Sequence, residues 1–108
     1  MSTLLPLDDN GHPIGIMGFA SNGTQKLNVG TSSVRTTTPL PGHISVISLI
    51  ATGAVRFEVG DAAVSASAQT SPYLHPGVYL DLPVSAHERH VALIAESGSC
   101  QAYVIGRN

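Results

Sequence analysis

The sequence has few charges and almost no means of covalent cross-linking. Only 11% of its 108 residues are Asp, Glu, Lys or Arg, less than half of the roughly 25% found in typical soluble domains. Cys100 is the only cysteine, so no disulfide can form within the chain and core packing must hold the fold. One lysine and four scattered arginines do not make the basic patch that binding to nucleic acid requires.

Long apolar runs and targeting patterns are also missing. The longest apolar stretch, residues 44–51, contains two serines and is far shorter than the roughly 20 residues of a membrane-spanning helix. Residues 1–7 lack the basic region and the long apolar region of a secretory signal. We therefore expect synthesis in a cytoplasm and no membrane partner.

Apolar side chains are abundant for so small a chain. Hydrophobic residues make up 43% of the sequence, and the mean hydropathy is +0.20. A net charge of only −2 with this much apolar content argues against disorder. A domain of this size hides only about 60–70% of the surface of its unfolded chain. We therefore expect the protein to associate with itself or with a large partner.

The first 24 residues differ from the rest. Glycine and proline recur every few positions, which prevents a helix or a long regular strand. We predict an extended N-terminal arm over residues 1–24 that packs either on its own domain or, as we prefer, on a neighbouring subunit. The large apolar side chains available to that contact are Leu4, Leu5, Leu7, Ile14, Ile16, Met17 and Phe19.

From residue 25 onward the patterns are those of β-strands. Residues 55–59 alternate between apolar and charged side chains, as in a strand with one face in a core and one in water. No segment has a helical stripe of useful length. We predict one all-β domain over residues 25–108, a β-sandwich or jelly roll of about seven to eight antiparallel strands. The expected strands are 27–29, 32–38, 43–52, 55–59, 78–82, 90–96 and 100–105, with a weak strand at 64–68.

Two stretches resemble each other. Residues 49–60 and 93–106 both have Leu-Ile-Ala, then a turn with glycine, then a second apolar strand that ends in glycine. This similarity predicts two related β-hairpins, one in each half of a two-layer sandwich. A chance likeness between two segments rich in Val and Ile is the alternative.

Two of the expected strands, residues 44–51 and 91–95, are apolar on both faces. In residues 44–51, Ile47 and Leu49 share one face, whereas Val46 and Ile50 share the other. Antiparallel sandwiches usually leave one face of each sheet in water, so we expect the outer faces to be covered by the arm or by another subunit. We assign Ile47, Leu49 and Ile94 to that interface, where each buried Ile or Leu contributes roughly 1.5–3 kcal/mol.

Residues 87–90, His-Glu-Arg-His, are the only cluster that resembles a catalytic or metal site. The spacing is one residue shorter than the His-Glu-x-x-His of zinc proteases, which places two imidazoles on one face of a helix. Pro83 nearby favours a loop or strand, so we predict a solvated loop. The histidines at 12, 43 and 75 lie beside Gly or Pro, and only unrelated loops could bring them together around a metal.

Other catalytic patterns are missing. There is no Gly-x-Ser-x-Gly elbow, no glycine-rich phosphate loop, and no strand with the two histidines and carboxylate of a cupin enzyme. Cys100 lies in register with Ala102 and Val104, which predicts a small buried side chain rather than an activated thiol. We expect a protein without enzymatic activity, metal or cofactor.

Three stretches carry a resemblance to a known group of proteins. Residues 5–14 have the sequence LPLDDNGHPI, and residues 55–60, VRFEVG, precede a loop rich in Ala, Ser and Thr and then YLHPGV at 73–78. Residues 98–105 form a Gly-Ser-x-x-x-Tyr-Val-Ile strand. These stretches resemble small virion proteins of tailed bacteriophages, in whose pattern the position of His75 more often holds Ala.

The resemblance implies a capsid decoration, or cement, protein on the virion surface. Such proteins are usually β-sandwiches that trimerise between capsomers and clamp neighbouring capsid subunits. The implied partners are other copies of the chain and the major capsid protein or another virion protein. A head-to-tail connector or tail accessory protein is one alternative. A ligand- or receptor-binding β-sandwich module is another, which exposed aromatic residues in a groove would favour.

Overall fold

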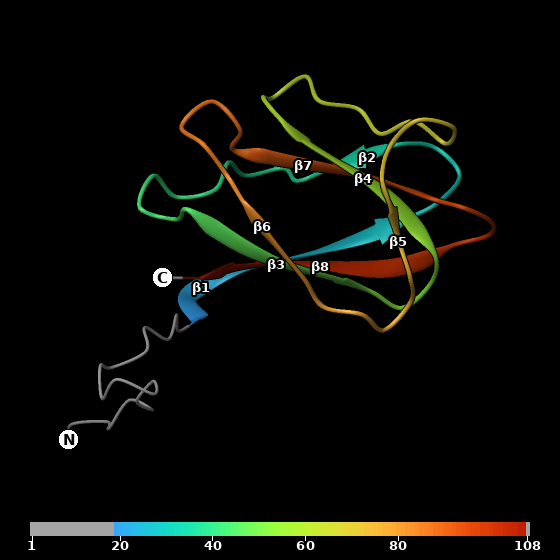
Figure 1. Cartoon of the computed structure of the whole chain (residues 1–108), viewed down its shortest axis with the longest axis horizontal. Helices are drawn as coiled ribbons and strands as arrows, with labels where there is room; N and C mark the ends of the chain where they lie inside the picture. Colours follow the sequence, from blue (N-terminus) through green and yellow to red (C-terminus); the bar gives the residue numbers. More distant parts are fainter. Residues whose placement is uncertain (1–18, 108) are drawn as a thin grey trace, which may run out of the picture.

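Eight antiparallel strands form two four-stranded sheets in the computed structural model, which describes residues 19–107 (Figure 1). The first sheet has the order β1-β8-β3-β6 and the second has the order β2-β7-β4-β5. The strands are β1 (Phe19–Val29), β2 (Val34–Arg35), β3 (Val46–Ala51), β4 (Val55–Gly60), β5 (Tyr73–Leu74), β6 (Leu80–Pro83), β7 (His90–Ala95) and β8 (Cys100–Arg107). Within the described residues, no helix is long and apolar enough to cross a membrane.

The strands pair in a nested order. β1 pairs with β8, β2 with β7, β3 with β6 and β4 with β5, as if one long hairpin had been folded over itself. The pairs β3 with β8 and β4 with β7 then complete the two sheets. This arrangement is a jelly roll, an eight-stranded double-sheet sandwich. The predicted fold class is therefore confirmed.

The two similar stretches are not hairpins, and this part of the prediction is wrong. β3 and β4 lie in different sheets, as do β7 and β8, so the turns after Ala51 and Ala95 carry the chain from one sheet to the other. β3 pairs with β8 and β4 with β7, which places the two stretches side by side in both layers. A short turn with glycine suits either connection, so local sequence does not distinguish a hairpin from a crossing between sheets.

Several strand boundaries also differ from those predicted. β1 begins at Phe19, opposite Arg107 at the end of β8, so the first sheet starts before the predicted boundary at residue 25. The threonine-rich run at 32–38 forms only the two residues of β2. No strand forms at 64–68, and β5 forms at 73–74 instead. Short edge strands of this kind depend on tertiary pairing more than on local pattern.

The core lies between the two sheets. Its side chains come from alternate positions of the strands, with Leu49 on β3 and Leu93 on β7 both fully buried. Cys100 is partly buried against this core, as expected from its register. The largest fully buried apolar side chains are Val29, Ile44, Ile47, Leu49, Val55, Val91, Leu93 and Val104.

A loop between β4 and β5 covers the outer face of the second sheet. Val64 and Ala66 of this loop pack against Ala92 and Ile94 of β7, in a cluster separate from the main core. The backbone N–H of Ala66 donates a hydrogen bond of 2.9 Å to the hydroxyl of Ser33. Only 9% of Ile94 remains exposed.

Polar contacts fix the far end of the same loop to β4. The Arg56 Nη1 donates to the backbone oxygen of Ser71 at 3.0 Å, and the Ser71 hydroxyl donates to Glu58 Oε1 at 3.0 Å. Arg56 Nε also forms an ion pair with Glu96 Oε1 at 2.5 Å. The charged outer side of β4 therefore holds the loop in place across the sheet.

The structure corrects the predicted outer face of β3 and the expected cover over β7. Ile47 and Leu49 are 0% exposed and belong to the core, so they are not available to another subunit. Both faces of β3 carry apolar side chains, and a shift of one residue exchanges the faces of a strand, so the pattern could not show which face is outside. Ile94 does lie on an outer face, but the loop of its own chain covers it.

The burial of Leu49 gives a direct test of this face assignment. We predict that Leu49→Ala lowers the free energy of unfolding by about 2–5 kcal/mol, because it leaves a cavity in the core. Ile50→Ala on the half-buried outer side should lower it much less. Chemical denaturation of dilute protein, followed by circular dichroism, measures both variants. An equal or larger loss for Ile50→Ala would contradict the assignment.

Candidate functional site

The outer face of the first sheet carries aligned rows of side chains across β1, β8 and β3. In one row Lys26 lies opposite Tyr103, which in turn lies opposite Ile50. Tyr103 and Ile50 are half-buried, whereas Lys26 is exposed. Leu27, the neighbour of Lys26, packs on the core side, so the lysine is on the outer face beside Tyr103.

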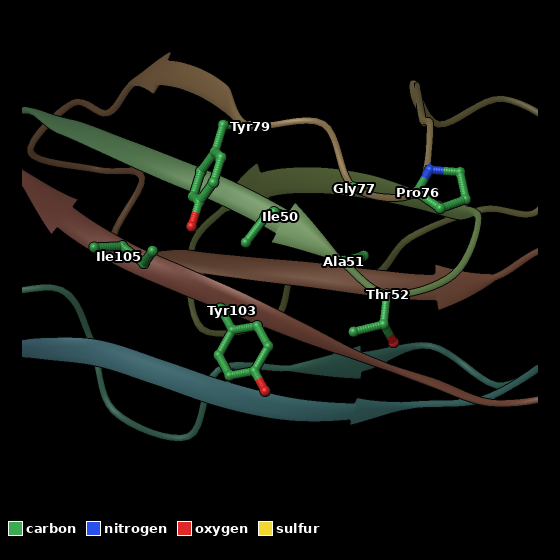
Figure 2. A pocket seen from close by; sticks show the side chains of 8 residues that line it. All are labelled: Ile50, Ala51, Thr52, Pro76, Gly77, Tyr79, Tyr103 and Ile105. Carbon is green, nitrogen blue, oxygen red and sulfur yellow. The ribbon is translucent and has the colours of Figure 1, made fainter.

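An open apolar hollow lies over this face (Figure 2). Its volume is about 550 Å³, which is within the range of roughly 300–1,000 Å³ typical of ligand pockets. Tyr79 and Tyr103 stand on opposite sides of it, with Ile50 and Ile105 between them (Figure 2). The residues that line it are Ile50, Ala51, Thr52, Pro76, Gly77, Tyr79, Tyr103 and Ile105.

The segment before β6 forms one wall of the hollow. Gly77 has a φ of +77°, a conformation that suits glycine, and its N–H donates a 2.9 Å hydrogen bond to the backbone oxygen of Ala51. This bond ties the wall to the end of β3. Beyond Gly77, Val78 is 45% exposed and Tyr79 is 63% exposed, so this wall presents a large apolar surface to the outside.

A polar group of three side chains lies beside the hollow on the same face. The Ser48 hydroxyl donates to Asp81 Oδ1 at 2.5 Å, and Arg107 Nη1 donates to the Ser48 oxygen at 2.9 Å. Arg107 and Asp81 are 3.6 Å apart. Ser48 is only 1% exposed, so its hydroxyl cannot reach a substrate and the group joins β3, β6 and β8.

Two residues of the His-Glu-Arg-His cluster, Arg89 and His90, form contacts that hold the fold together. His90 is buried at the start of β7, with Nδ1 3.0 Å from the backbone oxygen of Thr36 and 3.2 Å from its hydroxyl. Arg89 donates to the backbone oxygens of Leu40, Pro41 and Ser85. The prediction of a solvated loop therefore holds for exposed His87, but it is wrong for His90.

The other three histidines were expected on loops. His43 and His75 lie on exposed loops, as expected, and His12 lies outside the described residues. Across residues 19–107, no group of three or more His, Cys, Asp or Glu side chains is placed to hold a metal ion.

The residues predicted for the interface lie in different parts of the structure or outside its described residues. Ile47 and Leu49 are in the core, and Ile94 is under the loop after β4. Phe19 opens β1 through its backbone pairing with Arg107. The other predicted residues, Leu4, Leu5, Leu7, Ile14, Ile16 and Met17, lie outside the described part of the chain.

The hollow itself was missed because its residues come from three separate segments. β8 does carry a signal, since Tyr103 and Ile105 alternate with Ala102 and Val104 and make this strand apolar on both faces. Tyr79 gives no such signal, because only the pairing of β6 with β3 brings it to the same surface. The apolar outer face expected from residues 44–51 exists, but Val46 and Ile50 form it.

Comparison with family models, curated proteins and solved structures finds no match to this chain. The function must therefore be inferred from the residues themselves. The lining of the hollow offers aliphatic surface, two aromatic rings and their hydroxyl groups. Such a lining suits the binding of an apolar segment or an aromatic group.

Thr36 provides a test of the structural role of His90. Its hydroxyl also accepts a 3.2 Å hydrogen bond from the N–H of Val91. We predict that Thr36→Val lowers the free energy of unfolding by about 1–3 kcal/mol, because it leaves buried polar groups unsatisfied. The exposed neighbour Thr37→Val serves as the control in the same denaturation experiment. Equal stability of the two variants would show that the contacts of the Thr36 hydroxyl with His90 and Val91 contribute little.

Proposed function

We propose that the protein is a non-enzymatic structural component that attaches to other copies of itself and to a larger assembly. One observation carries this proposal. Within residues 19–107, the loop after β4 covers the outer face of the second sheet, whereas an open apolar hollow remains on the outer face of the first. An exposed apolar surface of this kind, on a domain with little charge, favours association.

The assembly that we propose is the virion of a tailed bacteriophage, with the chain acting as a trimeric decoration protein on the capsid surface. The resemblance of residues 5–14, 55–78 and 98–105 to such proteins supports this choice. Jelly rolls occur in viral capsid domains but also in lectins and cupins, so the fold alone does not decide the function. Many weak contacts repeated by symmetry would give strong attachment without any bond chemistry. A head-to-tail connector or tail accessory protein would use the same surface.

A second candidate function has an observation of its own. Tyr79 and Tyr103 flank the hollow, and exposed aromatic rings in a groove are a feature of ligand- and receptor-binding modules. In this case the hollow would take a small apolar or aromatic ligand, or a side chain of a receptor.

Fractionation of virus particles tests the proposed function. We predict that the chain sediments with gradient-purified particles from a strain that carries its gene, and that antibody labelling places it on the shell. Ile50→Lys should shift the chain to the soluble fraction, because it places a charge in the hollow. Ala68→Lys, on the exposed loop over the other sheet, is the matched control and should stay with the particles.

The results that contradict the proposal are equally clear. Wild-type chain found only in the soluble fraction would exclude a virion component. Labelling of tails rather than shells would favour the connector or tail alternative. Retention of Ile50→Lys on the particles would show that attachment does not use the hollow.

A further inference from the structure

The apolar hollow has a chemical counterpart within the same sequence. Residues 4–7 are Leu-Leu-Pro-Leu, and Asp8 and Asp9 follow directly. The hollow offers Ile50, Tyr103 and the other lining residues to apolar side chains. Lys26, the only lysine of the chain, is exposed beside Tyr103. An apolar stretch followed by two carboxylates therefore matches an apolar hollow that has a cation at its edge.

The position of β1 limits how far residues 4–7 can reach. β1 begins at Phe19, opposite Arg107, whereas the hollow begins two positions back along β8, at Ile105, and continues to Tyr103. Leu7 and Phe19 are twelve positions apart, a stretch that spans at most about 40 Å when fully extended. This length is enough to reach a neighbouring molecule.

Entry from the same chain along the end of β8 would pass a polar group. A segment that entered from Phe19 along β8 would pass Arg107, which donates to Ser48 and lies close to Asp81. Leucine side chains gain little by lying on these charged groups. The hollow is open on its outward side (Figure 2), so a segment from another molecule can enter without crossing that group.

We propose that residues 4–7 of one copy occupy the hollow of the next copy, with Asp8 and Asp9 beside its Lys26. This inference rests on the self-association in the proposed function and names the surfaces that carry it. Each copy then donates one segment and presents one hollow. Such a head-to-tail contact can close into a ring, and three copies would give the expected trimer.

Complementation between two full-length variants tests this contact. The segment variant carries Leu4→Ser, Leu5→Ser and Leu7→Ser and keeps its hollow. The hollow variant carries Ile50→Lys and keeps its segment. Light scattering at tens of micromolar should give a trimer for the wild type and a monomer for each variant alone. An equal mixture should give a dimer, because only one segment and one hollow remain intact and the ring cannot close.

Each other result has a definite meaning. A segment variant that stays trimeric would overturn the inference but leave self-association through another surface. Two monomeric variants that fail to form a dimer on mixing would also overturn it, since no segment then passes between copies. A wild type that is monomeric throughout this range would overturn both the inference and the self-association in the proposed function.

A charge exchange supplies a second test that does not depend on folding of the hollow variant. Lys26 is exposed, so Lys26→Glu should not disturb the core. It should weaken trimer formation at low salt by up to about fivefold, the upper end for a surface ion pair. Adding Asp8→Lys and Asp9→Lys to the same chain should restore association. Failure of Lys26→Glu to weaken it, or of the added lysines to restore it, would place the carboxylates elsewhere.

Discussion

A two-layer sandwich has one dry layer, yet the central strands of this chain are apolar on both faces. β3 and β8 in the first sheet, and β7 in the second, each send apolar side chains inward and outward. Packing between the sheets satisfies only the inward set. The outward set needs a cover of its own, because burial of apolar surface is the main driving force for folding and association.

The two sheets meet this constraint differently. Over β7 the chain uses its own loop, and the contacts of Ser71 with Arg56 and Glu58 hold that loop down. Over β3 and β8 no described segment does the same, and Tyr79 with the segment before it only walls off one side of a hollow. Among the described residues, the low charge of the chain therefore corresponds to an open apolar surface on one face.

The sequence predicts the general fold well and the choice of faces poorly. Alternation in β4 and the apolar runs of β3 and β7 were enough to predict an all-β sandwich, since strand period is a local property. Which side of β3 faces the core depends on its partners, because Ile47 and Ile50 are equally apolar. Ser48 marks the outer face of β3, because its hydrogen bonds with Asp81 and Arg107 lie outside the core. Those bonds are visible only in three dimensions. The cover over Ile94 was missed for a related reason, because a loop of small residues at 62–70 carries no strong apolar signal of its own.

The central claim is that the hollow between Tyr79 and Tyr103 is covered when the protein assembles. The chain has no tryptophan, so Tyr79→Trp creates a single reporter at the edge of the hollow. Its fluorescence emission should shift to shorter wavelength as protein concentration rises and oligomers form, because the indole then leaves water. An emission maximum that stays at the wavelength of water-exposed indole while light scattering shows the oligomer would contradict the claim.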